Sequence, residues 1–240
     1  MRLPALCAVL LLSAAFSAVS SAHDITAKSD GKVEPAFDIT KAQAVTDGRL
    51  AEFAMEVSGE AGSVKPKATG QLKGAKVEAY VWPTKIDPAV VGFAQGSGIL
   101  ALAITAHPDF DDTPLYDENN DGDPANDGAN WHSHWVVLGE DKACGAGLKV
   151  RDVSPGSDVL PATGPGLPIA LDSPGMSPLI KGSGVRITMP LKGQQDAAFD
   201  AVTAELQVNA EGKAPLLCVT GVHKIASGKL TFPGTITLKK

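Results

Sequence analysis

The residues best suited to metal chemistry gather in one stretch of the sequence, from His107 to Trp135. Three of the chain's five histidines lie there, and two of them, His132 and His134, form an H-x-H pattern. Residues two apart in a strand project to one face of a sheet, so these two imidazoles can ligate one ion. His107 ends the preceding apolar run. If that run pairs with residues 131–138, the third imidazole reaches the same end of the sheet.

Three imidazoles are suitable ligands for zinc or copper, with a fourth position open for water or a carboxylate. A carboxylate close to His107 could be that fourth ligand, or could orient an imidazole N–H. The candidates are Asp109, Asp111 and Asp112. The alternative is that His132 and His134, which share a face with Val136 and Leu138, hydrogen-bond the loop carboxylates without metal.

The H-x-H strand is similar to the zinc strand of the α-type carbonic anhydrases, in which a Trp also follows the second His. Here Trp135 follows His134. The resemblance is confined to this short stretch. It implies a metal-bearing strand and carries over no activity.

An acidic loop between His107 and the H-x-H pair holds a second pattern. From Asp117 it reads D-x-N-x-D-G, the opening of an EF-hand-type calcium loop, and it resembles the D-x-D-x-D-G loops of extracellular calcium proteins. Gly128 occupies the twelfth position, where an EF-hand has a bidentate Glu. The expected calcium ligands are Asp117, Asn119, Asp121, Asp123 and Asp127. The alternative is a solvated loop rich in Asx turns.

The charge distribution favours a cation as the partner. The 240-residue chain has a formal net charge of -6, and residues 86–141 contain eleven acids and no Lys or Arg. A nucleic-acid binder needs clustered basic residues, so nucleic acid is not an expected partner. A hydrophobic fraction of 44% is enough for a folded core.

The elements that position these residues are expected to be strands. Period-two alternation predicts half-buried strands at 52–57, 76–81, 185–189 and 202–208. More continuous apolar runs at 99–106 and 216–222 predict central strands. Residues 87–93 are a weak helix candidate. The pattern predicts an all-β fold, an antiparallel β-sandwich of the Ig-like, Greek-key type.

Two long insertions are expected within a single domain formed by residues 23–240. One is the acidic loop at 108–130, and the other is a Pro- and Gly-rich loop at 152–182 with six prolines. Loops of this length in a compact domain are usually functional or disordered. The prolines favour an ordered cover, and a simple connection between sheets is the alternative.

The N-terminus predicts export. Residues 1–22 have the pattern of a signal peptide, with Arg2, an apolar run and small residues before a cleavage site after Ala22. Cleavage there makes His23 the first residue, which could chelate copper or be a free tail. The rest of the chain has no apolar segment long enough to span a membrane. A periplasmic or secreted protein is expected.

The two cysteines outside the signal peptide, Cys144 and Cys218, are expected to form a disulfide in an oxidising compartment. The alternative is a thiolate copper or zinc site. The pair has no C-x-x-C spacing, which favours the disulfide.

These features predict an exported metal-binding protein that buffers or delivers zinc or copper, with calcium holding the acidic loop. One alternative is a zinc-dependent enzyme, in which the metal lowers the pKa of a bound water to about 7. Another is an extracellular adhesion or binding module stabilised by calcium. The sequence lacks a G-x-S-x-G nucleophile motif, a Walker loop and a dinucleotide-binding glycine motif after a strand.

Overall fold

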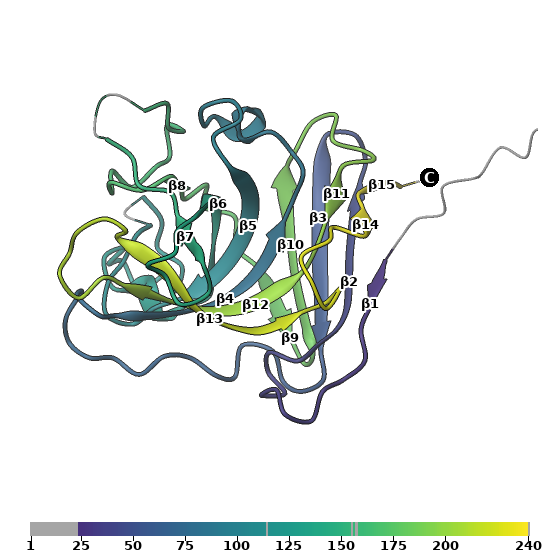
Figure 1. Ribbon diagram of the computed structural model, residues 1–240, viewed down its shortest axis with the longest axis horizontal. Helices are drawn as coiled ribbons and strands as arrows, with labels where there is room; N and C mark the ends of the chain where they lie inside the picture. The colour runs from purple at the N-terminus through teal and green to yellow at the C-terminus, as the bar shows by residue number, and fades with distance from the viewer. Residues whose placement is uncertain (1–23, 114, 155, 157, 240) are drawn as a thin grey trace, which may run out of the picture.

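The computed structural model describes residues 24–113, 115–154, 156 and 158–239, and its regular elements are nearly all strands (Figure 1). The predicted signal peptide at 1–22 and the predicted first residue of the mature chain, His23, lie outside the described residues. No helix in the described ranges is both long and apolar enough to cross a membrane.

The larger sheet closes into a six-stranded antiparallel barrel. In order around the ring, its strands are β4 (Lys76–Pro83), β12 (Val202–Val208), β13 (Leu217–Ile225), β7 (Leu148–Val150), β6 (His132–Glu140) and β5 (Ile99–Ala106). The ring closes because β5 pairs with both β4 and β6. A short strand, β8 (Leu171–Asp172), pairs with β6 outside the ring.

A second sheet lies beside the barrel (Figure 1). Its strands are β1 (Ile25–Thr26), β2 (Ile39–Thr46), β3 (Leu50–Val57), β10 (Gly184–Pro190) and β9 (Leu179–Lys181), with β15 (Thr237–Leu238) parallel to β2. A separate pair joins β11 (Ala198–Phe199) to β14 (Gly234–Thr235).

Strand β5 is apolar at every position except Thr105 because both of its faces are buried. Leu100 and Leu102 belong to the core between the barrel and the second sheet, whereas Ala101 and Ala103 belong to the core inside the barrel. Side chains alternate between the two faces of a strand, so one strand supplies both cores. Strand β5 therefore carries apolar residues at consecutive positions, whereas β12, which is buried mainly on its inner face, alternates them with Thr203, Glu205 and Gln207.

Aromatic side chains dominate the core between the barrel and the second sheet. The ring centroid of Phe53, from β3, lies 6.1 Å from that of Trp82 and 6.3 Å from that of Trp135, both on barrel strands. Large aromatic rings bury much apolar area, and tilted or edge-on pairs of this kind are favourable. Trp135 thus fixes the outer face of β6, and the other face of that strand is turned into the barrel.

The prediction of an all-β antiparallel fold is confirmed, but a β-sandwich is not, because the larger sheet closes on itself. The apolar run at 99–106 is β5, and the helix candidate at 87–93 contains a short 3-10 helix, η1 (Pro88–Val91). The acidic loop at 108–130 holds another, η2 (Asp127–Ala129), while the 152–182 loop contributes β8 and β9.

The predicted disulfide joins Cys144 to Cys218, with the two Cα atoms 5.1 Å apart. It lies where the barrel has the least strand pairing, because β13 meets β7 at a single registered pair, Cys218 with Lys149. The covalent bond therefore reinforces this seam between β7 and β13.

Replacing both cysteines with Ser should lower the free energy of unfolding by about 4 kcal/mol, because the bond closes a loop with a sequence separation of 74. Guanidinium unfolding of oxidised wild type and the double variant measures the difference. Reduced wild type is the matched control and should behave like the variant. A difference near zero would mean that the barrel restrains this loop without the bond.

Candidate metal centre

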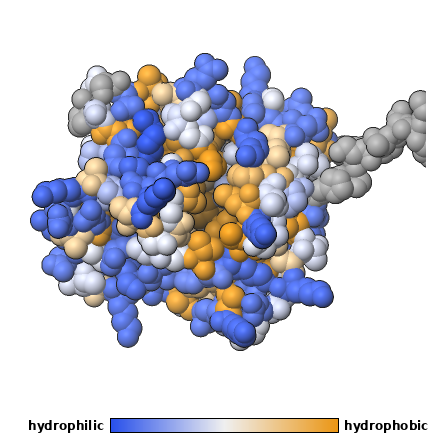
Figure 2. Space-filling view, viewed as in Figure 1, coloured by the Kyte–Doolittle hydropathy of each residue, from blue (hydrophilic) through white to orange (hydrophobic). Residues whose placement is uncertain are grey.

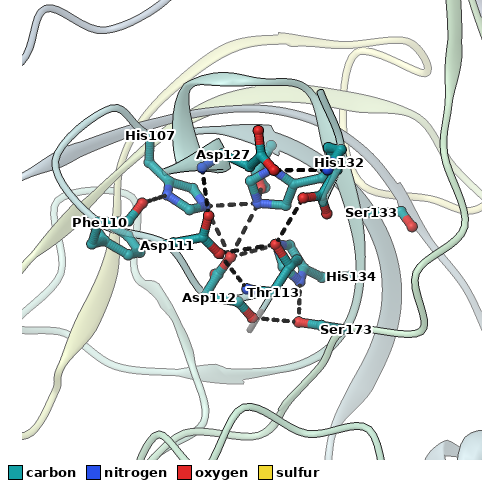
Figure 3. A network of polar contacts seen from close by, with 12 residues as sticks. His107, Phe110, Asp111, Asp112, Thr113, Asp127, His132, Ser133, His134 and Ser173 are labelled. Atoms are coloured by element: carbon teal, nitrogen blue, oxygen red, sulfur yellow. Dashed lines mark hydrogen bonds and ion pairs between the residues drawn. The ribbon is translucent and has the colours of Figure 1, made fainter. Parts of the chain in front are cut away.

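Four buried side chains converge at one end of the barrel interior (Figure 3). They are His107, Asp112, His132 and His134, and one donor atom from each lies within 4.8 Å of all the others. None of the four residues is more than 4% exposed. Such a group of nitrogen and oxygen donors can hold a metal ion.

The pairing of β5 with β6 brings the histidines together. Thr105 is opposite His132 and Ala103 is opposite His134, so the two imidazoles of β6 lie on the inward face of the sheet. His107 follows Thr105 by two positions and therefore continues that face beyond the end of β5. The expectation that the third histidine reaches the H-x-H pair is met in the structure.

Two of the imidazoles are oriented by backbone carbonyls. Nδ1 of His107 lies 2.9 Å from the Phe110 carbonyl oxygen, and Nδ1 of His132 lies 2.7 Å from that of Asn130. A carbonyl oxygen only accepts, so each Nδ1 carries the proton that it donates. In the neutral ring the lone pair is then on Nε2.

The third imidazole, that of His134, is also protonated on Nδ1, and its hydrogen-bond partner is a hydroxyl group. Ser173 Oγ donates its proton to the carbonyl oxygen of Asp112 at 2.8 Å and lies 3.0 Å from Nδ1 of His134. Because the hydroxyl has one proton and that proton is in use, Nδ1 of His134 must be the donor. Its Nε2 is also left with a free lone pair.

The three Nε2 atoms face one another and one carboxylate oxygen. Oδ1 of Asp112 lies 3.2, 3.1 and 3.3 Å from Nε2 of His107, His132 and His134, respectively. Nε2 of His132 is 2.9 Å from that of His107. With neutral rings these contacts bring lone pairs together, so the cluster needs a shared cation, either a proton or a metal ion.

Nε2 of His134 is the clearest sign of this need. It is buried at ion-pair distance from Asp112 but forms no hydrogen bond with any described residue. Buried polar atoms are nearly always hydrogen-bonded, and an exception calls for an unseen partner such as an ion. A metal ion at the centre of the cluster would supply that partner.

The protonation equilibria of the cluster are strongly shifted. Burial by itself raises the pKa of Asp112, but the charges of His134 and His107 and hydrogen bonds from the imidazoles hold it well below its usual value. Burial lowers the pKa of His134. For His132 the effect of burial is outweighed by Asp112, so its pKa is raised. The carboxylate is therefore ionised, and His132 is the ring that takes up a proton more readily than His134.

Of the three acids predicted near His107, only Asp112 joins the cluster. Asp109 accepts hydrogen bonds from the backbone N–H groups of Thr69 and Gly70, both at 2.6 Å, and so anchors a different loop. Asp111 accepts from the backbone N–H groups of Thr113 and Asp127, both at 2.7 Å. These two carboxylates shape the acidic loop around the site.

The predicted calcium ligands form Asx-type turns. A carboxylate oxygen of Asp117 accepts from Gly122 N–H at 2.7 Å, Asn119 Oδ1 accepts from Asp121 N–H at 2.7 Å, and Asp121 Oδ1 accepts from Asp123 N–H at 2.9 Å. Asp127 is buried and accepts from Glu118 N–H at 2.7 Å. Within the described ranges these residues do not form a convergent acidic group, so calcium stays a prediction.

Three supporting residues had no role in the sequence analysis. Ser173 is one of several serines in the Pro-rich loop, and no local pattern distinguishes it from the others. Phe110 stacks on His107 with ring centroids 4.0 Å apart, and Asn130 contributes only a carbonyl, which any residue could supply.

No family model, no curated protein and no solved structure matches this chain. The centre is therefore interpreted from its own chemistry.

The hydrogen bonds predict the imidazole tautomers. With a metal ion bound at the cluster, all three rings should be protonated on Nδ1 and carry no proton on Nε2, because the carbonyl oxygens of Phe110 and Asn130 and the Ser173 hydroxyl accept from Nδ1. Long-range 15N–1H correlation spectra of the ring nitrogens measure this. An Nε2–H tautomer at any of the three rings would contradict the orientation described above. His223, whose Nε2 contacts Glu78, serves as the internal reference.

Proposed function

We propose that this chain is a metal-binding protein that holds one zinc or copper ion on His107, Asp112, His132 and His134. The observation that carries the proposal is the orientation of the imidazoles. Each Nδ1–H is donated outward to an oxygen, and each Nε2 lone pair points inward toward the same carboxylate. Metal-ligating histidines are commonly held in this way.

The nitrogen and oxygen ligands of the cluster favour some metals over others. Three imidazole nitrogens and one carboxylate oxygen suit zinc in a four-coordinate site, and imidazole also suits copper. Calcium and magnesium prefer oxygen ligands throughout and are disfavoured at this centre. Closed sites with four protein ligands are typical of ions that the protein retains, which favours buffering of the ion over catalysis.

A smaller polar pocket offers a path for the ion. It has a volume of about 100 Å³, and its lining includes Tyr116, Asp117, Glu118 and His132. His132 thus connects the buried centre with the acidic loop. Carboxylates along such a path attract a cation toward the imidazoles. The acidic loop would then guide metal inward.

The second candidate function is a metal-dependent enzyme. The observation that favours it is that His107, Asp112 and His134 also line a larger apolar cavity inside the barrel. A catalytic metal needs an open position beside a pocket, and a fifth ligand from the cavity side would provide one.

We infer that the protein is exported. The Cys144–Cys218 disulfide supports this, because such bonds persist in the periplasm and outside cells and are rare in the cytosol.

The metal content tests the proposal directly. Purified protein that has been stripped and reloaded should bind one zinc or copper ion per chain by elemental analysis. His132→Ala should weaken binding at least about 100-fold, because a direct ligand matters more than the supporting contacts, whose loss costs about 10–100-fold. His223→Gln is the matched control, since that ring pairs with Glu78 away from the cluster. Wild-type protein that binds neither ion would overturn the proposal.

Ser173→Ala tests the orienting hydrogen bond. The variant keeps all four donors but leaves Nδ1 of His134 without its acceptor, so zinc affinity should fall about 10–100-fold. Competition with a chromophoric chelator measures the affinity. Ser173→Thr keeps the hydroxyl group and should retain most of the zinc affinity. Unchanged binding in Ser173→Ala would show that the ring is held by packing alone.

Acidification should release the metal, since protons compete for the three Nε2 atoms. Affinity should begin to fall above about pH 6.5, the ordinary histidine value, because the pKa of His132 is raised, and should continue to fall below it as His134, whose pKa is lowered, takes up a proton. A pH series of the same competition assay measures this, and a flat profile between about pH 7 and 5 would exclude imidazole ligation.

Calcium can be tested separately. If the acidic loop binds calcium, Asp121→Asn should reduce calcium binding while zinc remains, and His132→Ala should do the reverse. Calorimetric titration with each ion measures both. Absence of calcium binding in wild type at millimolar concentration would leave the loop as a set of Asx turns.

A further inference from the structure

The barrel interior contains a cavity of about 180 Å³ whose wall is almost entirely apolar. Its lining includes Val77, Ala79, Ala103, Val136, Leu206 and Val219. The polar residues His107, Asp112 and His134 also line it, and they belong to the metal centre. The cavity is thus an apolar chamber with one chemically active wall.

Small side chains leave this space open. Ala79, Ala103 and Ala204 point inward from three neighbouring strands, β4, β5 and β12, and all three line the cavity. Ala79 and Ala204 are directly paired, and Ala103 is paired with His134. The interior of a small barrel is normally filled by side chains, so three alanines at adjoining inward positions account for the void.

The chamber is accessible from outside. Val222 of β13 lines it and is 43% exposed, so the cavity reaches the surface at that edge. The space-filling view shows apolar residues gathered in a recess near the centre of one face, with hydrophilic side chains around it (Figure 2). An opening beside Val222 would give a small molecule access to the chamber.

We propose that the chamber binds a small apolar carboxylate whose carboxylate group coordinates the metal ion. This inference rests on the proposed metal centre. A divalent ion with three neutral imidazoles and one Asp112 carboxylate keeps one positive charge beside an apolar wall. A charge in apolar surroundings is costly unless it is paired, so an anionic group is the favoured occupant next to the ion.

The volume of the cavity limits the size of the apolar part of the ligand. An apolar cavity of about 150 Å³ in another protein stays dry and binds benzene. The chamber here, at about 180 Å³, has room for one six-membered ring with a short substituent. Benzoate meets both requirements, because its ring fits the apolar wall and its carboxylate reaches the metal.

Three probes separate the contributions of the carboxylate group and of the apolar ring to the binding affinity. Calorimetric titration of zinc-loaded protein should show benzoate binding at least tenfold more tightly than acetate, which lacks the ring, and than benzene, which lacks the charge. Cobalt(II) in place of zinc should report carboxylate coordination as a change in visible absorption. Metal-free protein should still bind benzene but should lose the preference for benzoate.

Two variants change the chamber without touching a metal donor. Ala204→Phe fills it and should reduce benzoate affinity at least tenfold while one zinc per chain remains bound. Leu206→Ala enlarges it and should shift the preference toward a bulkier carboxylate such as 4-ethylbenzoate. Ala89→Phe, at an exposed position in η1, is the control for an added phenyl ring.

The outcomes distinguish this inference from the proposed function. Zinc binding together with equal, weak affinities for benzoate, acetate and benzene would overturn the chamber as a ligand site and leave the metal centre standing. Benzene binding to a protein that takes up neither zinc nor copper would overturn the metal centre and, with it, carboxylate coordination. Benzoate binding that Ala204→Phe leaves unchanged, in a variant shown to be folded, would place the ligand elsewhere and also refute the proposal.

Discussion

The pairing of β5 with β6 is the interaction on which the rest of the structure depends. It closes the barrel, and its register sets Thr105 against His132 and Ala103 against His134. Side chains in strands alternate with period two, so a slip of one residue would turn both histidines outward and Trp135 inward. The aromatic core outside the barrel and the polar cluster inside it therefore enforce the same register.

Position and orientation come from different parts of the chain. The strands place the imidazoles, but the acceptors that turn them lie in loops: Phe110 and Asn130 at the two ends of the acidic loop, and Ser173 just after β8. Asp112 has a double role, since its side chain faces the imidazoles and its carbonyl fixes Ser173. The two long insertions thus meet at one centre, which gives each of them a structural reason to be ordered.

The sequence was informative where local pattern decides structure. Alternation located the main strands, H-x-H placed two imidazoles on one face, and the two cysteines outside the predicted signal peptide implied their disulfide. Closure of the barrel was not predictable, because strands of a barrel and of a sandwich alternate in the same way. The choice of Asp112 over Asp109 and Asp111 depends on loop hydrogen bonds made to residues distant in sequence, such as Thr69. Nothing near Ser173 marks it as a partner for His134.

The location of the disulfide has a consequence for the order of maturation. Without the bond, β7 and β13 are joined at one registered pair, so the ring is least secure there. The cavity requires a closed ring because β13 supplies part of its wall, whereas the four donors lie on β6 and in the loop that follows β5. A newly made chain in a reducing environment would therefore be slow to enclose the cavity beside these donors. Thiol oxidation would then come before any molecule is held in the cavity, so the compartment in which the chain is oxidised would also be the one in which the cavity becomes usable.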